Sequence, residues 1–289
     1  MHDLKYFYQY VHEYQTAIEY LSMYLCLSLM QKSEIHRYAM RLAFHGAPFS
    51  GWQIQTRQIT VQGELTNALR SLIKEDLNII GAGRTDTGVH GKNYVAHFDV
   101  LNEFDCQEVS FKLNRFLPER ISVYEIKKVG IDFHARFGAL SRSYSYTLRE
   151  KKHAFGNDLV CNYTRELDFE VLKSCSELVK NGKNFSAFEK KGSDNTNSIC
   201  EIYHSLWIRK DDSIIFQIRA NRFLRNMVRS IVGTMIETAN GKRDFNDWQS
   251  LLKGGERSDS GNSAPAHGLV FMGVNYSKSP FDGRETAKY

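Results

Sequence analysis

The stretch L-N-I-I-G-A-G-R-T-D-T-G-V-H-G-K-N-Y-V-A-H-F-D-V, from Leu77 to Val100, carries the strongest structural signal in the chain. Leu77 to Ile80 and Tyr94 to Val100 are short apolar runs, which are typical of strands. Between them lies a loop, Gly81 to Gly91, with four glycines. Glycine permits backbone angles that other residues avoid and lets another molecule come close. The stretch therefore predicts two strands joined by an unusually permissive loop.

The sequence on either side adds a helix and an outer strand. Before the stretch, apolar residues alternate from Tyr38 to Phe44, as in a strand with one buried face, and Val61 to Leu72 recur at helical spacing after a capping Thr60. After the stretch, Val109 to Leu117 predicts a helix and Ile121 to Val129 a strand. The resulting order, β-α-β-β-α-β, is that of the ferredoxin-like unit.

The same order of elements returns in the second half, although no residues match between the halves. We expect strands at Ser143–Leu148, Ile199–Ile208, Ile214–Ile218 and Leu269–Tyr276, and helices from Phe169 to near Gly182, at Met227–Ile236 and at Asp244–Leu252, the last capped by Asp244. The predicted organisation is an N-terminal extension of unknown role (residues 1–35), a first lobe (36–137) and a second lobe (138–289).

Bulk composition limits the class of protein. The chain has 289 residues and a formal net charge of +5, with a pI near 8.8, a balance that favours a polyanionic partner. Its five cysteines are scattered, odd in number and never in a C-x-x-C pair. They predict reduced thiols in a cytoplasmic protein and no zinc site.

The first 35 residues differ from the rest. Their apolar run, Tyr20 to Met30, is too short to span a bilayer and lacks the features of a signal peptide. We expect a short amphipathic helix or an ill-ordered extension. The alternative is an over-called start codon, with Met30 as the natural start.

Three hypotheses compete for Asp86, the acid in the glycine-rich loop. A dinucleotide loop would need a third glycine where Asp86 stands, and a carboxylate there would repel a pyrophosphate. An aspartic protease would pair Asp86 with Asp259, but Arg84 favours a fully ionised carboxylate rather than a shared proton. The third hypothesis is a single ionised carboxylate that acts as nucleophile or base beside arginines.

A second candidate feature is the run R-F-L-R-N-M-V-R, from Arg222 to Arg229, at the start of a predicted apolar helix. Arg225 and Arg229 are four residues apart and are expected to share a face. Apolar neighbours suggest that Arg229 is partly buried, and a buried arginine needs a partner. That partner could be a carboxylate within the second lobe, or Asp86 across the lobes.

Several aromatic residues have both a binding and a packing interpretation. Tyr144 and Tyr146 share a strand face with Leu148, where tyrosines could stack on a splayed base but are more often core residues. Trp52 is either an exposed binding residue or a loop anchor. His267 has no second ligand at metal-binding spacing, so no metal site is expected.

Taken together, seven segments resemble the TruA family of tRNA pseudouridine synthases. In family order they are G-W-Q, V-Q-G-E-L, G-R-T-D-T-G-V-H, F-H-A-R-F, S-Y-S-Y, F-L-R-N-M-V-R-S-I-V-G and A-P-A-H-G-L. The resemblance covers about Arg37 to Tyr276. It implies an α+β fold in which two ferredoxin-like (βαββαβ) lobes share a continuous antiparallel sheet, with helices on one side and a cleft between the lobes.

The same resemblance implies an activity and partners. The substrate would be uridine at positions 38, 39 and 40 of the tRNA anticodon arm, and a homodimer would hold one tRNA across both subunits. Isomerising uridine involves no redox change, so neither a cofactor nor a metal is expected. The rival function is a non-catalytic RNA-binding protein built on the same lobes.

Residue roles follow from matching positions. Asp86 resembles the catalytic aspartate, Arg84 the arginine that displaces the target base, and Tyr144 the tyrosine that stacks on the flipped uracil. Arg229 resembles the arginine that pairs with the carboxylate, and Leu269 the apolar residue of the uracil pocket. One departure is His45, where the family usually has aspartate, at a site that we expect to lie away from the chemistry.

Overall fold

The computed structural model describes residues 15, 18, 20–22, 35–192 and 196–281. The chain divides into two units, residues 1–35 and residues 36–289. Most of the first unit, including Met30 and Cys26, lies outside the described residues, so the expectations for the extension are not tested there. The four described cysteines, Cys106, Cys161, Cys175 and Cys200, are free thiols.

Two successive sets of elements build the second unit, each with the order β-α-β-β-α-β. The first set is β1 (His36–Phe44), α2 (Val61–Ile73), β2 (Ile80–Gly81), β3 (His90–Val100), α3 (Cys106–Phe116) and β4 (Ile121–Val129). The second is β5 (Ala139–Arg149), α4 (Phe169–Asn181), β7 (Ile202–Lys210), β8 (Ser213–Ala220), α5 (Met227–Ala239) and β9 (Leu269–Tyr276), with a short β6 (Cys161–Asn162) and an added α6 (Asp247–Gly254).

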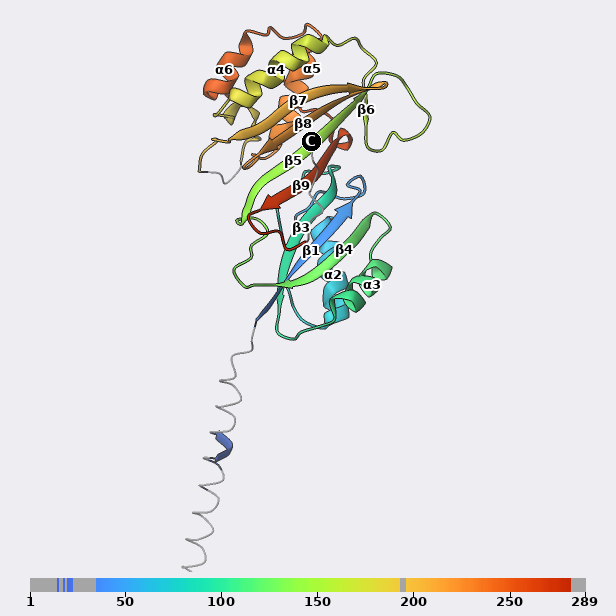
Figure 1. Ribbon diagram of the computed structural model, residues 1–289, viewed down its shortest axis with the longest axis vertical. Coiled ribbons are helices and arrows are strands. Elements are labelled where there is room, and N and C mark those ends of the chain that lie inside the picture. Colours follow the sequence, from blue (N-terminus) through green and yellow to red (C-terminus); the bar gives the residue numbers. More distant parts are fainter. Residues whose placement is uncertain (1–14, 16–17, 19, 23–34, 193–195, 282–289) are drawn as a thin grey trace, which may run out of the picture. The chain divides into compact units, whose positions relative to one another are not determined.

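The nine strands found in the described residues belong to one mixed sheet, with the order β4-β1-β3-β9-β5-β8-β7. The short strands β2 and β6 pair with β3 and β5. In Figure 1, β9 lies between β5 and β3 and therefore joins the two sets of strands. The molecule is thus an α+β protein with a large, mostly antiparallel sheet.

The prediction of a continuous antiparallel sheet is wrong where β9 joins the two sets of strands. β9 pairs with β3 in parallel, through His90 opposite Val270 and Gly91 opposite Phe271. β9 takes its direction from its long antiparallel pairing with β5, and no hairpin links it to β3. Hydrophobic alternation in the sequence reports which face of a strand is buried, but not which way a neighbour from the other half runs.

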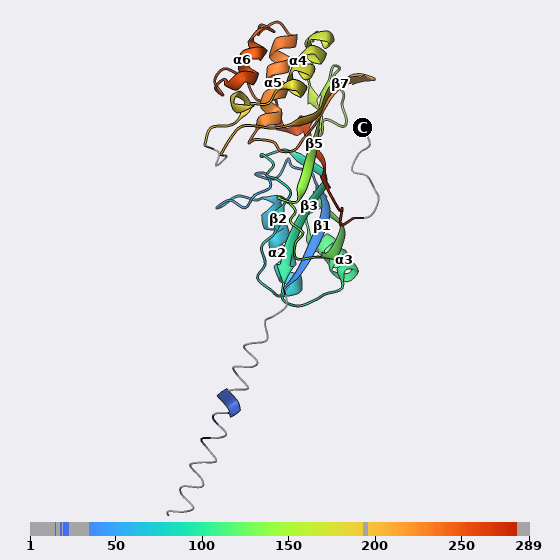
Figure 2. The same cartoon turned by 60° about the vertical axis from the view of Figure 1, so that its left-hand side comes forward.

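Helices cover the strands and contact one another within each half. α2 packs against α3, and α4 packs against both α5 and α6. Figures 1 and 2 show α4, α5 and α6 gathered on one side of the strands of the second half. No helix in the described part of the chain is long and apolar enough to cross a membrane.

One helix start and one shared helix face differ from the sequence expectations. Thr60 does cap α2, accepting a hydrogen bond from the Gly63 amide at 3.2 Å. However, α6 begins at Asp247, because the residues after Asp244 form a separate turn before it. α5 begins at Met227 after Asn226, which has a left-handed backbone (φ 64°). Arg225 therefore precedes the helix, is exposed, and does not share a helical face with Arg229.

Candidate active site

The segment between β2 and β3, residues 82–89, is here called the aspartate loop. It packs closely on the chain that follows β1: the Trp52 amide donates to the Thr85 carbonyl at 3.2 Å, and the Gly88 amide donates to the Phe49 carbonyl at 3.4 Å. Gly51 has φ 90°, and a Cβ there would press against the Thr85 carbonyl. The glycine at this position therefore permits the close approach that fixes the loop.

Asp86 projects from this loop toward α5. Its Oδ2 lies 3.5 Å from Nη1 of Arg229, and the two side chains are 26% and 21% exposed. The carboxylate partner of Arg229 is therefore in the first half of the chain, which decides between the two partners that the sequence left open. At this exposure the pair contributes little to stability, so its main effect is on the orientation of the carboxylate.

A second contact holds the Arg229 guanidinium. Its Nε donates to the Ala264 carbonyl at 2.8 Å, and the Ala264 amide donates to the Arg229 carbonyl at 2.9 Å. Arg229 is thus fixed both at its backbone and at its head group. Asp259, the rival partner for a proton-sharing pair, instead accepts a hydrogen bond from the Glu256 amide.

Tyr144 lies on β5 within the core. Its ring makes edge contacts with Phe223 and Phe271, at centroid distances of 5.1 and 5.2 Å. Burial raises the pKa of the Tyr144 hydroxyl well above its usual range, and the negative charge of Asp86 raises it further. Tyr144 therefore lies within electrostatic range of the aspartate.

The other two candidates differ in exposure. Leu269 is 4% exposed and stands opposite Tyr146 in the β5–β9 pairing. Arg84 is exposed, and its side chain has no hydrogen bond or ion pair with any described residue. It is therefore available to a substrate.

The surroundings of the aspartate loop contain residues whose place the sequence did not reveal. Trp52 is 3% exposed and packs on Tyr94 at 4.2 Å, so it is an anchor and not an exposed binding residue. The Tyr94 hydroxyl both donates to the Gly83 carbonyl and accepts from the Gly83 amide. A buried tyrosine thereby holds the start of the loop.

His45 is closer to the loop than we expected. Its ring contacts that of His90, with centroids 4.4 Å apart. His90 directly follows the aspartate loop and accepts a hydrogen bond at Nδ1 from the Gly46 amide, at 3.0 Å. Burial and, after it, the charge of His45 lower the pKa of His90 to about 4. His45, which stands where the family usually has aspartate, therefore contacts the residue that follows the aspartate loop.

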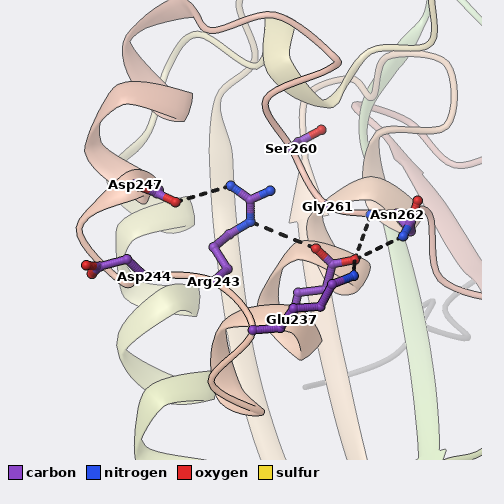
Figure 3. A pocket seen from close by; sticks show the side chains of 8 residues that line it. Glu237, Arg243, Asp244, Asp247, Ser260, Gly261 and Asn262 are labelled. Carbon is purple, nitrogen blue, oxygen red and sulfur yellow. Dashed lines mark hydrogen bonds and ion pairs between the residues drawn. The ribbon is translucent and has the colours of Figure 1, made fainter.

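A polar pocket lies at the end of α5, apart from Asp86 (Figure 3). Its lining includes Glu237, which accepts from the Asn262 amide at 3.2 Å and pairs with Lys242 at 3.1 Å. Burial alone would raise the pKa of Glu237, but these partners lower it overall. The network fastens residue 262 to α5, two residues before the Ala264 carbonyl that holds Arg229.

No group of three His, Cys, Asp or Glu side chains in the described residues could hold a metal ion. The side chains gathered at the site are a carboxylate fixed by an arginine, a tyrosine near it and an exposed arginine in the same loop.

Comparisons with known proteins identify the family of this chain. The family model described as "tRNA pseudouridine synthase" matches residues 181–277. A tRNA pseudouridine synthase A from Bacteroides fragilis is 39% identical over 250 residues, which are 86% of this chain and 99% of the relative. The enzyme of the same name from Parabacteroides distasonis is 39% identical over 86% of this chain and 98% of its own. That from Bacillus pumilus is 33% identical over 81% and 97%.

The family model and these relatives place the chain in a class of isomerases, the pseudouridine synthases. Within that class, the near full-length identity shows that the chain belongs to the tRNA pseudouridine synthase A family. The alignments cover almost the whole length of these relatives.

Proposed function

We propose that this tRNA pseudouridine synthase converts uridine to pseudouridine at positions 38, 39 and 40 of the anticodon arm, with Asp86 as its catalytic carboxylate. The observation that carries the proposal is the contact between Asp86 and Arg229, 3.5 Å apart although 143 residues separate them in sequence. Arg229 supplies the opposite charge and fixes the direction of the carboxylate, as a carboxylate that must act on one atom of a substrate requires.

The reaction explains why one carboxylate suffices. The N1–C1′ bond of uridine breaks, the uracil turns, and a C5–C1′ bond forms; C5 then loses its proton to water and N1 takes up a proton. No atom is gained or lost and no electron is transferred, so the reaction requires no cofactor. Asp86 would attack C1′, attack C6 or remove the 2′ proton, and all three routes use an ionised carboxylate.

The target base must leave the helical stack before its glycosidic bond can be reached, which costs a few kcal/mol. Arg84 is exposed and two residues from Asp86, so it could fill the space that the base vacates and bind a phosphate. Tyr144 would stack on the flipped uracil, and Leu269 would line the apolar side of the uracil pocket.

At the scale of the fold, the proposal includes two ferredoxin-like lobes, residues 36–137 and 138–289, with a substrate cleft between them and the helices on one side of the sheet. The strand orders support this: β4-β1-β3-β2 in the first half and β9-β5-β8-β7 in the second repeat the same order of strand positions within each set. The active protein would be a cytoplasmic homodimer that holds one tRNA across both subunits.

Release of tritium from tRNA labelled with [5-³H]uridine tests the activity directly, because the C5 hydrogen is lost to water. Folded protein that releases no tritium from unmodified tRNA would leave the rival function, a non-catalytic RNA-binding protein. The Asp86→Asn variant should lose turnover and keep its affinity for tRNA. Asp76→Asn, at a carboxylate that is 88% exposed, is the matched control and should keep both.

A further inference from the structure

Arg142 is an arginine that the chemistry above does not use. It lies on β5, two residues before Tyr144, and its side chain is half-buried. A guanidinium has five N–H donors in a rigid planar fork. Here the Nε and Nη2 groups donate to the Ala82 carbonyl at 3.3 and 3.1 Å. Nη1 donates to the carbonyls of Ala139, at 3.1 Å, and Asn221, at 2.9 Å.

The remaining donor of Nη2 bonds the Arg136 carbonyl. All five donors are therefore matched by four backbone carbonyls, and no carboxylate in the described residues lies within ion-pair distance of Arg142. Burial lowers the pKa of its guanidinium, since no opposite charge compensates the desolvation. Because every donor is occupied, Arg142 has none left for a phosphate, which excludes a direct role in binding RNA.

The four carbonyls belong to three different segments. Ala82 begins the aspartate loop, four residues before Asp86. Asn221 follows β8 at the start of the segment that leads into α5 and Arg229. Arg136 lies in the connection between β4 and β5, and Ala139 is the first residue of β5. The Arg142 side chain therefore bonds three segments at once. They are the aspartate loop, which carries Asp86, the segment that leads into α5 and Arg229, and the connection between the two halves of the chain.

We propose that Arg142 is a positioning residue that sets the placement of Asp86 relative to Arg229. The inference rests on the roles proposed above for those two residues. Arg142 acts through the backbone alone: it holds the base of the aspartate loop against the start of the segment that precedes α5. A lysine cannot replace it, because an ammonium has three donors around one atom and cannot span carbonyls on three segments.

Arg37 provides a matched control. It also holds a fork of bonds across segments, to Asp99 at 2.7 and 2.8 Å and to the carbonyls of Ile131 and Phe133 at 2.6 and 2.9 Å. However, it lies at the start of β1, whereas the aspartate loop packs on the chain that follows the end of β1. Arg37→Lys should therefore disturb the fold to a comparable degree without moving Asp86.

The experiment measures single-turnover tritium release at saturating tRNA, together with tRNA affinity, for Arg142→Lys, Arg37→Lys and Asp86→Asn. An ångström-scale displacement of a catalytic group can cost about 100-fold in rate, so Arg142→Lys should lose about that much. Its tRNA affinity and the rate of Arg37→Lys should stay within about threefold of wild type, as expected if only positioning is lost.

Hydrogen exchange gives a readout that does not depend on turnover. In Arg142→Lys, the peptides covering residues 82–90 and 221–229 should both exchange faster than in wild type, and in Arg37→Lys neither should. Unchanged exchange in both peptides, or a rate for Arg142→Lys no lower than that of Arg37→Lys, would overturn the positioning role. Turnover by Asp86→Asn would instead overturn the catalytic assignment of Asp86, whatever Arg142→Lys does.

Discussion

Arg229 divides its guanidinium between two acceptors, the Asp86 carboxylate and the Ala264 carbonyl. Lysine has a single nitrogen and cannot hold both in this geometry. We expect Arg229→Lys to lower single-turnover tritium release by about 10- to 100-fold, because Asp86 loses its fixed direction.

Arg225→Lys is the control for this prediction, since Arg225 is exposed and precedes α5. Its rate at saturating tRNA should stay near that of wild type, even if its KM rises. If Arg229→Lys were as active as Arg225→Lys, the ion pair with Asp86 would have no role in the reaction.

Two buried histidines make stability depend on pH. Burial lowers the pKa of both His90 and His97 from 6.5 to about 4. His90 faces His45, His267 and Asp158, and His97 faces Arg37, His134 and Asp99. Between pH 6.5 and pH 4 the unfolded chain therefore binds more protons than the folded one. The contribution of the two neutral histidines to the free energy of unfolding is complete above pH 6.5 and is lost as the pH falls toward 4.

The free energy of unfolding should thus decrease from pH 7 to pH 5, by about 2 kcal/mol for each of the two histidines. Urea titrations at the two pH values measure this. His97 Nδ1 accepts a hydrogen bond from the Ala135 amide at 3.2 Å, and the side-chain oxygen of an asparagine can accept the same bond. In His97→Asn the decrease should therefore be smaller by the contribution of one histidine. An equal decrease in wild type and variant would contradict the assignment.

The side chains to which we assign a role in the reaction were easier to predict than the side chains that hold them in place. Asp86, Arg84 and Arg229 stood out because charged residues among glycines or apolar residues are unusual. Arg142 lies just before the S-Y-S-Y segment and outside it, and its partners are backbone carbonyls, which every residue has and no sequence pattern marks. His45 looked remote because only the folded chain brings β1 and the start of β3 together, where its ring meets His90.

At the scale of elements, the position of α5 depends on the close packing of residues 262–264 against it. A Cβ on Gly233 would overlap the Asn262 carbonyl oxygen, so only glycine lets residues 262–264 lie against the helix. In an exposed helix, Gly→Ala would stabilise by about 1 kcal/mol. Here we expect Gly233→Ala to destabilise by about 1–3 kcal/mol, because overpacking forces the backbone to move.

The same substitution should lower turnover, because moving residue 262 shifts the Ala264 carbonyl that holds Arg229. Urea unfolding and tritium release on one preparation test both effects. Stability equal to or above that of wild type would mean that the segment is free to move away from α5.

The starts of α2 and α5 show which helix boundaries can be predicted from local sequence and which cannot. Thr60 bonds the Gly63 amide, a local contact with a known spacing, and its cap could be predicted. α5 has no side-chain cap hydrogen bond, and its start depends on the left-handed backbone of Asn226. The Asn226 side chain bonds Ser263, 37 residues away, and such a tertiary contact leaves no trace in local sequence.

At the scale of the whole molecule, the joined sheet brings the site together. Asp86 comes from the first half and Arg229 and Tyr144 from the second, and the short parallel pairing of β3 with β9 links the two halves beside the aspartate loop. Element order in each half could be predicted from local periodicity. The pairing between the halves could not, because it depends on two strands that lie far apart in the sequence.

The balance of charge governs the encounter with tRNA. The chain carries 38 Lys and Arg against 33 Asp and Glu, and each phosphate neutralised on binding releases counterions. The logarithm of tRNA affinity should therefore fall linearly with the logarithm of salt concentration, with a slope of about 0.7–0.9 for each phosphate contact.

Individual basic residues can be compared through this slope. Arg84 is exposed and has no partner in the described residues, so Arg84→Ala should reduce the slope by about one contact, or 0.7–0.9. Lys112 is paired with Glu108 on α3, and Lys112→Ala should leave the slope unchanged. Filter binding with Asp86→Asn as the parent protein keeps turnover out of the measurement. Equal slopes for the parent and its Arg84→Ala variant would mean that Arg84 does not contact a phosphate in the bound state.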